Sequence, residues 1–140
     1  MKYAELSIGN LVYYNGNAIK VESITKREVG YHTQPNENNM HFAKMCEILP
    51  IPITEEILLK IGFKKCIDGN KLYRYAIAEC IMEIRFLDIG TLIKLENYKS
   101  DYVRKVHLPQ TPYIHQLQNA YLLVTGKEFE LCRERLLIHI

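Results

Sequence analysis

Hydrophobic positions toward the C-terminal end of the chain recur at spacings of three and four, which is the period of a helix with one buried face. The stripe consists of Ile114, Leu117, Tyr121 and Val124. Thr111 stands where an N-cap residue belongs, Pro112 suits the first helical position, and Gly126 can close the helix in the left-handed conformation. The pattern predicts a capped helix over residues 112–125.

Between residues 8 and 48, short segments of alternating apolar and polar residues are separated by strong turn signals. Asn15-Gly16 is the dipeptide that favours a type I′ hairpin turn, so the strands on either side of it should pair. Two further strand candidates flank a polar, amide-rich loop at residues 34–39. Several short antiparallel strands in such a stretch indicate an SH3-like β-barrel or a bent antiparallel sheet.

Two prolines, Pro50 and Pro52, hold the backbone extended and end this first region. Thr54 then caps a short helix that Gly62 ends. Five strand candidates follow, at residues 63–67, 71–77, 80–87, 92–98 and 102–108. The order of helix, antiparallel meander and helix predicts an α+β fold. We expect an SH3-like β region at 1–50 and an α+β region at 51–140, packed together as one compact unit.

The tail over residues 128–140 fits both a helix and a strand, and we favour a short helix.

The chain has 140 residues, of which 48% are hydrophobic and 24% charged, a composition typical of a folded globular protein. Its 18 basic and 16 acidic residues give a net charge of +2, well below the charge of most obligate nucleic-acid binders. No apolar run reaches the length of a signal peptide or a membrane span, so we expect a cytoplasmic protein that does not bind a membrane. The four cysteines are widely separated and lack metal-ligand spacing to the histidines, so we expect no metal site and no cofactor.

One polar cluster is dense enough to suggest a site. It lies in the first turns of the C-terminal helix, largely outside the apolar stripe, and comprises His115, Gln116, Gln118 and Asn119. Helix N-terminal amides attract anions, and a histidine there can act as a general base, so the cluster is a candidate for ligand or partner binding. The alternative is that these side chains bond to neighbouring elements and lock the helix in place. No nearby nucleophile or carboxylate completes a catalytic set, so we expect no enzyme activity.

Basic residues recur along the strands of the second region, and tyrosines are interleaved with them. The candidates for contact with nucleic acid are Lys64, Lys65, Arg74 and Arg85. If these residues share the solvent face of the meander with tyrosines such as Tyr73 and Tyr75, that face would bind a single strand by phosphate contact and base stacking. Carboxylates are interspersed among the same strands, and they favour an ordinary mixed surface.

Three motifs occur in sequence along the chain: IGNLV at residues 8–12, PIPIT at 50–54 followed by EEILLKIGF, and YIHQLQNAY at 113–121 followed by LVTGKEF. In order and spacing they resemble a family of small uncharacterised proteins from bacterial prophages and other mobile elements. The resemblance covers most of the chain before Glu128. It implies a cytosolic accessory protein of mobile-element origin and implies no activity.

From these observations we expect a non-enzymatic binding or adaptor protein that contacts an unidentified protein partner through strand edges or the amide-rich helix turn. The alternative is a weak nucleic-acid-binding protein that uses the basic sheet face. An enzyme centred on His115 is the least favoured hypothesis. The oligomeric state is left open.

Overall fold

The computed structural model describes residues 6–34, 36–66, 71–77, 80–97, 102–108 and 112–131. Its strands are β1 (Leu11–Tyr14), β2 (Asn17–Lys20), β3 (Ser23–Ile24), β4 (Glu28–Tyr31), β5 (His41–Lys44), β6 (Lys64–Lys65), β7 (Leu72–Ile77), β8 (Cys80–Leu87), β9 (Gly90–Asn97) and β10 (Tyr102–Leu108). A short 3-10 turn (Met45–Glu47) and the helices α1 (Glu55–Ile61) and α2 (Ile114–Thr125) complete the fold. Antiparallel sheets and two helices confirm the predicted α+β class.

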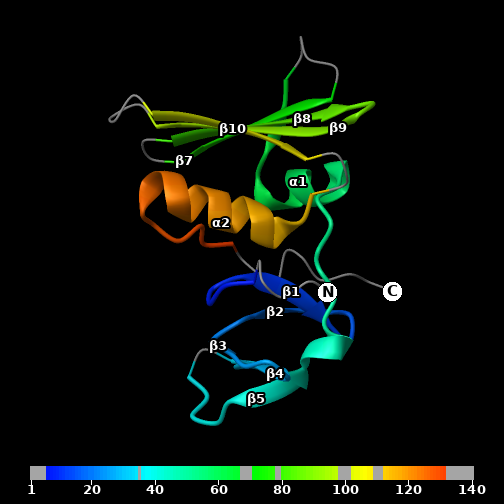
Figure 1. Ribbon diagram of the computed structural model, residues 1–140, viewed down its shortest axis with the longest axis vertical. Helices are drawn as coiled ribbons and strands as arrows, with labels where there is room; N and C mark the ends of the chain where they lie inside the picture. Colours follow the sequence, from blue (N-terminus) through cyan, green and yellow to red (C-terminus); the bar gives the residue numbers. More distant parts are fainter. Residues whose placement is uncertain are drawn as a thin grey trace.

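The elements are stacked in layers (Figure 1). A five-stranded antiparallel sheet of order β10-β9-β8-β7-β6 forms one end of the molecule, and α1 and α2 lie beneath it. The β1–β2 hairpin lies under the helices, and the three-stranded sheet β3-β4-β5 forms the opposite end. Both helices therefore lie on the same side of the large sheet.

The N-terminal strands form a bent arrangement rather than a barrel. Asn15 and Gly16 have φ angles of 51° and 79°, as the predicted type I′ turn requires. After β2 the chain leaves the first hairpin and pairs with β4. Val21 still donates its N–H to the carbonyl of Asn10, whereas Glu22 donates its N–H to the carbonyl of Gly30 in β4. Among the described residues this bend leaves two separate sheets, so the SH3-like barrel is not closed and the bent antiparallel sheet is the correct alternative.

The β1–β2 hairpin contributes to two hydrophobic cores because successive side chains of a strand point to opposite faces. Leu11, Tyr13 and Ala18 belong to the large core, together with both helices and the five-stranded sheet. Val12 and Ile19 belong to the small core, together with the three-stranded sheet. The hairpin is thus the shared layer between the two ends of the molecule.

The first helix has the boundaries that the sequence predicts. The Thr54 hydroxyl oxygen accepts a hydrogen bond from the Ile57 N–H at 3.2 Å, and Gly62 ends α1 with a φ of 111°. The helix presents its apolar residues to the large core. From the sheet, the large core receives the alternate residues Tyr73, Cys80, Met82, Ile84, Ile93 and Leu95.

The second helix begins later than the sequence predicts. The expected first helical residue, Pro112, instead accepts a hydrogen bond from the Ile53 N–H at 2.8 Å, and Ile114 donates its N–H to Ile51 at 2.9 Å. This short antiparallel bridge keeps the backbone extended up to the start of α2, so tertiary pairing overrides the local helix signal. The expected cap residue, Thr111, lies outside the described residues.

Helix α2 is buried on two sides, which corrects the expectation of a single apolar stripe. The stripe is buried at its first three positions and partly buried at Val124, as predicted. However, His115 and Gln118 are also buried, with exposed fractions of 1% and 5%. The reason is that α2 lies between the large sheet and the β1–β2 hairpin, so its polar side also faces protein (Figure 1).

Two further predictions concern segments that the structure covers only in part. Residues 127–131 form neither helix nor strand, and the rest of the tail lies outside the described residues. The expected hairpin turn at 68–70 also lies outside them. Within the described ranges, no helix combines the length and the apolar character that crossing a membrane requires.

Candidate functional site: the open face of the large sheet

The face of the five-stranded sheet opposite the helices carries a row of charged side chains, one from each strand. Directly opposite residues of antiparallel strands share a face, and the pairing register links the five positions in a continuous series. From β6 to β10, the row is Lys64, Arg74, Glu83, Lys94 and Lys105. Four of its five members are basic.

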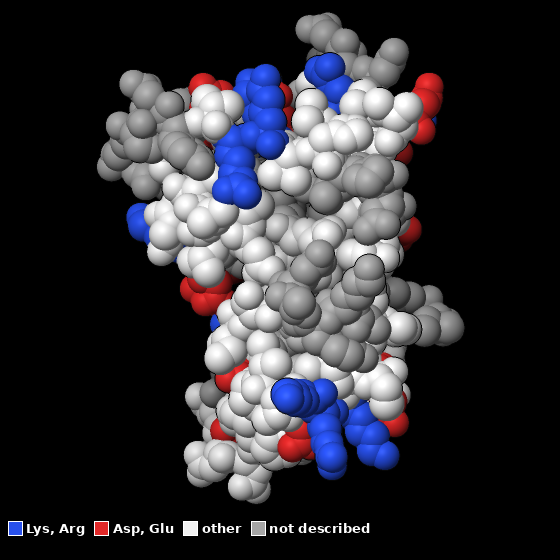
Figure 2. Space-filling view, viewed as in Figure 1, with Lys and Arg blue, Asp and Glu red and all other residues white. Residues whose placement is uncertain are grey.

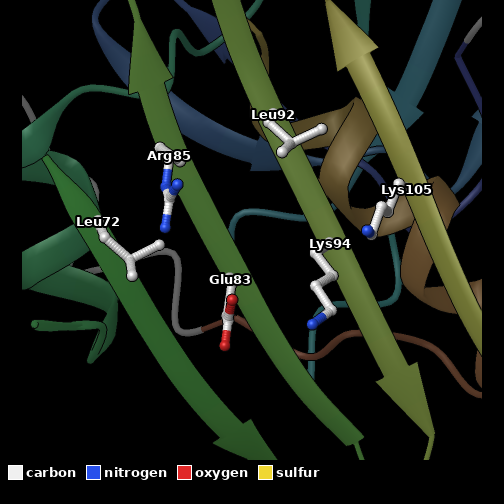
Figure 3. A pocket seen from close by; sticks show the side chains of 6 residues that line it. All are labelled: Leu72, Glu83, Arg85, Leu92, Lys94 and Lys105. Carbon is white, nitrogen blue, oxygen red and sulfur yellow. The ribbon is translucent and has the colours of Figure 1, made fainter. Parts of the chain in front are cut away.

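The neighbouring row on the same face consists of Leu72, Arg85, Leu92 and His107. Together, the two rows enclose a shallow hollow of about 200 Å³ (Figure 3). Its lining combines three cations, one carboxylate and two leucines, all on the same side of the sheet: Leu72, Glu83, Arg85, Leu92, Lys94 and Lys105. Such a lining suits a ligand that carries both negative charge and aliphatic groups.

Only part of the positive charge on this face is compensated within the chain. Arg74 forms an ion pair with Glu83 at 2.7 Å, and Lys94 lies 4.0 Å from Glu96. The other three cations form no ion pair with any residue that the structure describes: Lys64, Arg85 and Lys105. The described strand residues of the face therefore carry three more positive than negative charges.

The register also places two lysines directly opposite each other, Lys94 on β9 and Lys105 on β10. Like charges in this position destabilise a sheet. On the side of the molecule shown in Figure 2, by contrast, basic and acidic side chains lie intermixed in small groups. The concentration of cations on the open sheet face is therefore a feature that folding alone does not require.

The alternative in which cations and tyrosines share the open face is wrong for Tyr73 and Tyr75. Tyr73 lies in register with Lys65, on the side of the sheet that faces the helices, and is buried. Burial, together with a hydrogen bond to Glu55, raises the pKa of Tyr73 to about 12. Tyr75 lies on the same side and stacks on Phe63, with ring centroids 5.1 Å apart.

Of the four predicted nucleic-acid residues, Lys64, Arg74 and Arg85 lie together on the open face. Lys65 does not: it points to the other side of the sheet and lies 3.6 Å from Glu55. The reason is the two-residue period of a strand, which sends adjacent residues to opposite faces. Lys94 and Lys105 take part in the site although they were not among the leading candidates.

The amide cluster of α2 lies elsewhere, between the helix and the β1–β2 hairpin. The Gln118 side-chain oxygen accepts a hydrogen bond from the Leu11 N–H at 2.8 Å, and its nitrogen donates to the carbonyl oxygens of Gly9 and Phe129 at 3.3 and 3.4 Å. Gln118 therefore joins three segments that are far apart in the chain. Such contacts agree with the alternative in which the cluster holds the helix in place.

The other members of this cluster also make contacts within the chain. Asn119 accepts a hydrogen bond from the side chain of Asn10 at 2.9 Å. Gln116 accepts one from the Tyr113 N–H at 2.8 Å, which satisfies a backbone donor at the start of α2. The buried His115 ring stacks on the Tyr113 ring, with centroids 5.7 Å apart and planes at 9°. Ligand binding by this cluster stays a prediction, and its buried members are not accessible to a large partner.

Across the described ranges, no three His, Cys, Asp or Glu side chains lie together as metal ligands would. Comparison with family models, curated proteins and solved structures finds no match to the chain. Function is therefore inferred from the chain's own residues.

Proposed function

We propose that this chain is a non-enzymatic binding protein, a cytoplasmic adaptor of mobile-element origin that docks an acidic partner protein on the open face of its large sheet. The observation that supports this proposal is a group of three cations, Lys64, Arg85 and Lys105, that form no ion pair with a described residue and lie on a face that no described element covers. The mobile-element origin rests on the resemblance of the three sequence motifs alone.

A protein partner accounts for the apolar part of this face. Leu72 and Leu92 line the hollow beside the cations, and Val103 at the edge of the sheet is 49% exposed. Contact between these aliphatic side chains and apolar residues of a partner removes apolar surface from water, which favours binding. Acidic residues on that partner would pair with the surplus cations and guide its approach.

The second candidate is weak nucleic-acid binding, and the same row of cations is the observation that favours it. Phosphate contacts alone give binding that weakens steeply as salt rises. Base stacking would require aromatic side chains, and Tyr73 and Tyr75 lie on the opposite side of the sheet. A protein partner is therefore the better supported of the two.

Fluorescence anisotropy with labelled probes of equal net charge tests this proposal. The probes are an all-glutamate peptide, a peptide with the same number of glutamates plus leucines, and an oligothymidylate. The leucine-containing peptide should bind most tightly. Replacing Leu72 and Leu92 with serine should remove its advantage over the all-glutamate peptide, because the remaining attraction is then electrostatic.

A double variant, Arg85→Glu with Lys105→Glu, should weaken binding of both peptides about tenfold or more, since each reversed charge removes one favourable pair and adds a repulsion. The matched control is Lys26→Glu with Lys44→Glu, two exposed lysines at the opposite end of the molecule (Figure 1). Equal loss in both double variants would refute a specific site. Nanomolar binding of the oligothymidylate that survives high salt would favour the nucleic-acid function instead.

A further inference from the structure

The strand β10 forms one edge of the large sheet. Within the described part of the chain, β10 pairs with β9 alone, so one side of its backbone has no strand partner. It is seven residues long, whereas the strand at the opposite edge, β6, has only two. Among the strands that the structure describes, β10 therefore has the longest free edge of this sheet.

A free edge presents a repeating series of N–H and C=O groups to which an extended segment can add as a further strand. In this mode of recognition, the main-chain hydrogen bonds provide affinity, and alternate side chains provide specificity. The seven residues of β10 match the length of a usual strand. No proline interrupts them.

The side chains of β10 determine which side chains a bound segment would need. Lys105 lies on the open face, next to Lys94. Arg104 lies on the opposite side, in register with the buried Leu95. Residues 103–107 include no carboxylate. A strand added at this edge would therefore meet positive charge on both of its faces.

A second copy of this chain is a poor occupant of the edge. If two β10 strands paired with each other, the basic residues of one would lie beside those of the other, and like charges across a strand pair are destabilising. Lysine on an edge strand is a common means of preventing such self-association. The charge of β10 thus disfavours its own copy and favours an acidic segment.

We propose that β10 accepts an extended acidic segment of the partner protein as a sixth strand of the sheet. This inference rests on the proposed function, because it specifies how the acidic partner engages the open face. Neighbouring strands lie about 4.8 Å apart, so a carboxylate opposite Lys105 extends the charged row of the face by one position. An aliphatic residue of the added segment, placed opposite Val103, covers the Val103 side chain, which is half-exposed.

The experiment uses two peptides of the same sequence, in which glutamate alternates with valine. In the first, the backbone is unmodified; in the second, alternate amides are N-methylated along the edge that would face β10. N-methylation keeps every charge and removes the donors that a strand addition needs. We expect the unmodified peptide to bind at least about tenfold more tightly than the methylated one, the loss expected for several missing hydrogen bonds.

Amide hydrogen exchange supplies an independent measurement. On binding of the unmodified peptide, alternate amides of β10 should exchange at least about tenfold more slowly, because opening now requires release of the added strand. Amides of β4, in the small sheet, serve as the internal control and should not change. Lys105→Glu should reduce the affinity for the unmodified peptide, while Lys44→Glu should leave it unaltered.

The outcomes separate a failure of strand addition from a failure of the proposed function. If both peptides bind equally and the Arg85→Glu, Lys105→Glu variant still loses affinity, the charged face binds acidic partners but strand addition is wrong. If neither peptide binds, both proposals are wrong. If sedimentation shows a dimer whose β10 amides are protected without peptide, a second copy occupies the edge and the acidic segment is overturned.

Discussion

The bonds of Gln118 allow a sharp test of how the two ends of the molecule are joined. Replacing this residue with glutamate keeps its size and its acceptor for the Leu11 N–H but removes the amide N–H groups. The second carboxylate oxygen would then face two backbone carbonyl oxygens, those of Gly9 and Phe129. The position is buried, because the exposed fraction of Gln118 is only 5%. The variant is therefore destabilised in a way that depends on its protonation.

The size of the loss follows from two contributions. Two long hydrogen bonds at 3.3 and 3.4 Å are lost, each worth about 0.5–1.5 kcal/mol. Burial beside two carbonyl dipoles raises the pKa of the new carboxyl group above its usual value, and leaving its second oxygen without a donor costs about 1–3 kcal/mol at neutral pH. The free energy of unfolding should therefore fall by about 2–6 kcal/mol at pH 7.

The sign of the pH dependence is fixed by the direction of this shift. A group whose pKa is higher in the folded state favours folding in its protonated form, so the electrostatic penalty is absent below the unfolded pKa of about 4.3. It grows as the pH rises from the unfolded pKa through the higher folded pKa, and it is complete above the folded pKa. Below about pH 4.3 the carboxyl group is protonated and can donate its O–H to one of the two carbonyls, so the loss should shrink to that of one hydrogen bond, about 0.5–1.5 kcal/mol.

The assay is chemical denaturation of the variant and the unmodified protein at pH 4 and pH 7.5, and Gln116→Glu is the matched control. The Gln116 oxygen accepts a hydrogen bond from the Tyr113 N–H in the first turn of α2, and a carboxylate makes the same bond with added stabilisation of about 0.3–1 kcal/mol from the helix dipole. A loss under about 1 kcal/mol for Gln118→Glu at pH 7.5, or a loss independent of pH, would refute this account of the contact.

Three further substitutions test the packing and the turns. Tyr121→Ala should lower the free energy of unfolding by about 3–5 kcal/mol, because Tyr121 is 5% exposed and packs edge-on against Phe129; a loss below about 1 kcal/mol in denaturation would contradict that. Thr54→Ala should cost about 1 kcal/mol through loss of the cap of α1, and an unchanged denaturation midpoint would count against the cap. Gly62→Ala should lower the free energy of unfolding by about 1–3 kcal/mol, because a φ of 111° is strained for alanine. A melting temperature equal to that of the unmodified protein would contradict the left-handed conformation of this residue.

Local signals along the chain predicted most of the secondary structure. The dipeptide Asn15-Gly16 and the residues Thr54, Gly62 and Gly126 each act within a few positions, and the structure places each at the predicted turn or cap. The start of α2 and its second buried side were not predicted, because both depend on segments far away in the sequence. The bridge between residues 51–53 and 112–114 has no signature in either segment alone.

The candidate site was predicted in part for a similar reason. The two-residue turn at 88–89 fixes the pairing of β8 with β9, so the register that places Glu83 opposite Lys94 follows from counting back from that turn. The alternation of charged with buried positions would likewise have separated Lys64 from Lys65. The position of Lys105 could not be obtained in this way, since a longer connection precedes β10 and leaves its register open.

The bond between Gln118 and Leu11 also has a consequence for how the protein is made. The two residues are 107 positions apart, and a ribosome adds about 5–20 residues per second. The first hairpin is therefore synthesised roughly 5–20 seconds before the helix that covers it. During that interval the apolar side chains of Leu11 and Tyr13 lack the part of their core that α2 supplies, so this layer is completed only after α2 has been made. A message that ended before residue 114 would yield a product with this layer exposed, which is the kind of surface that chaperones retain and proteases remove.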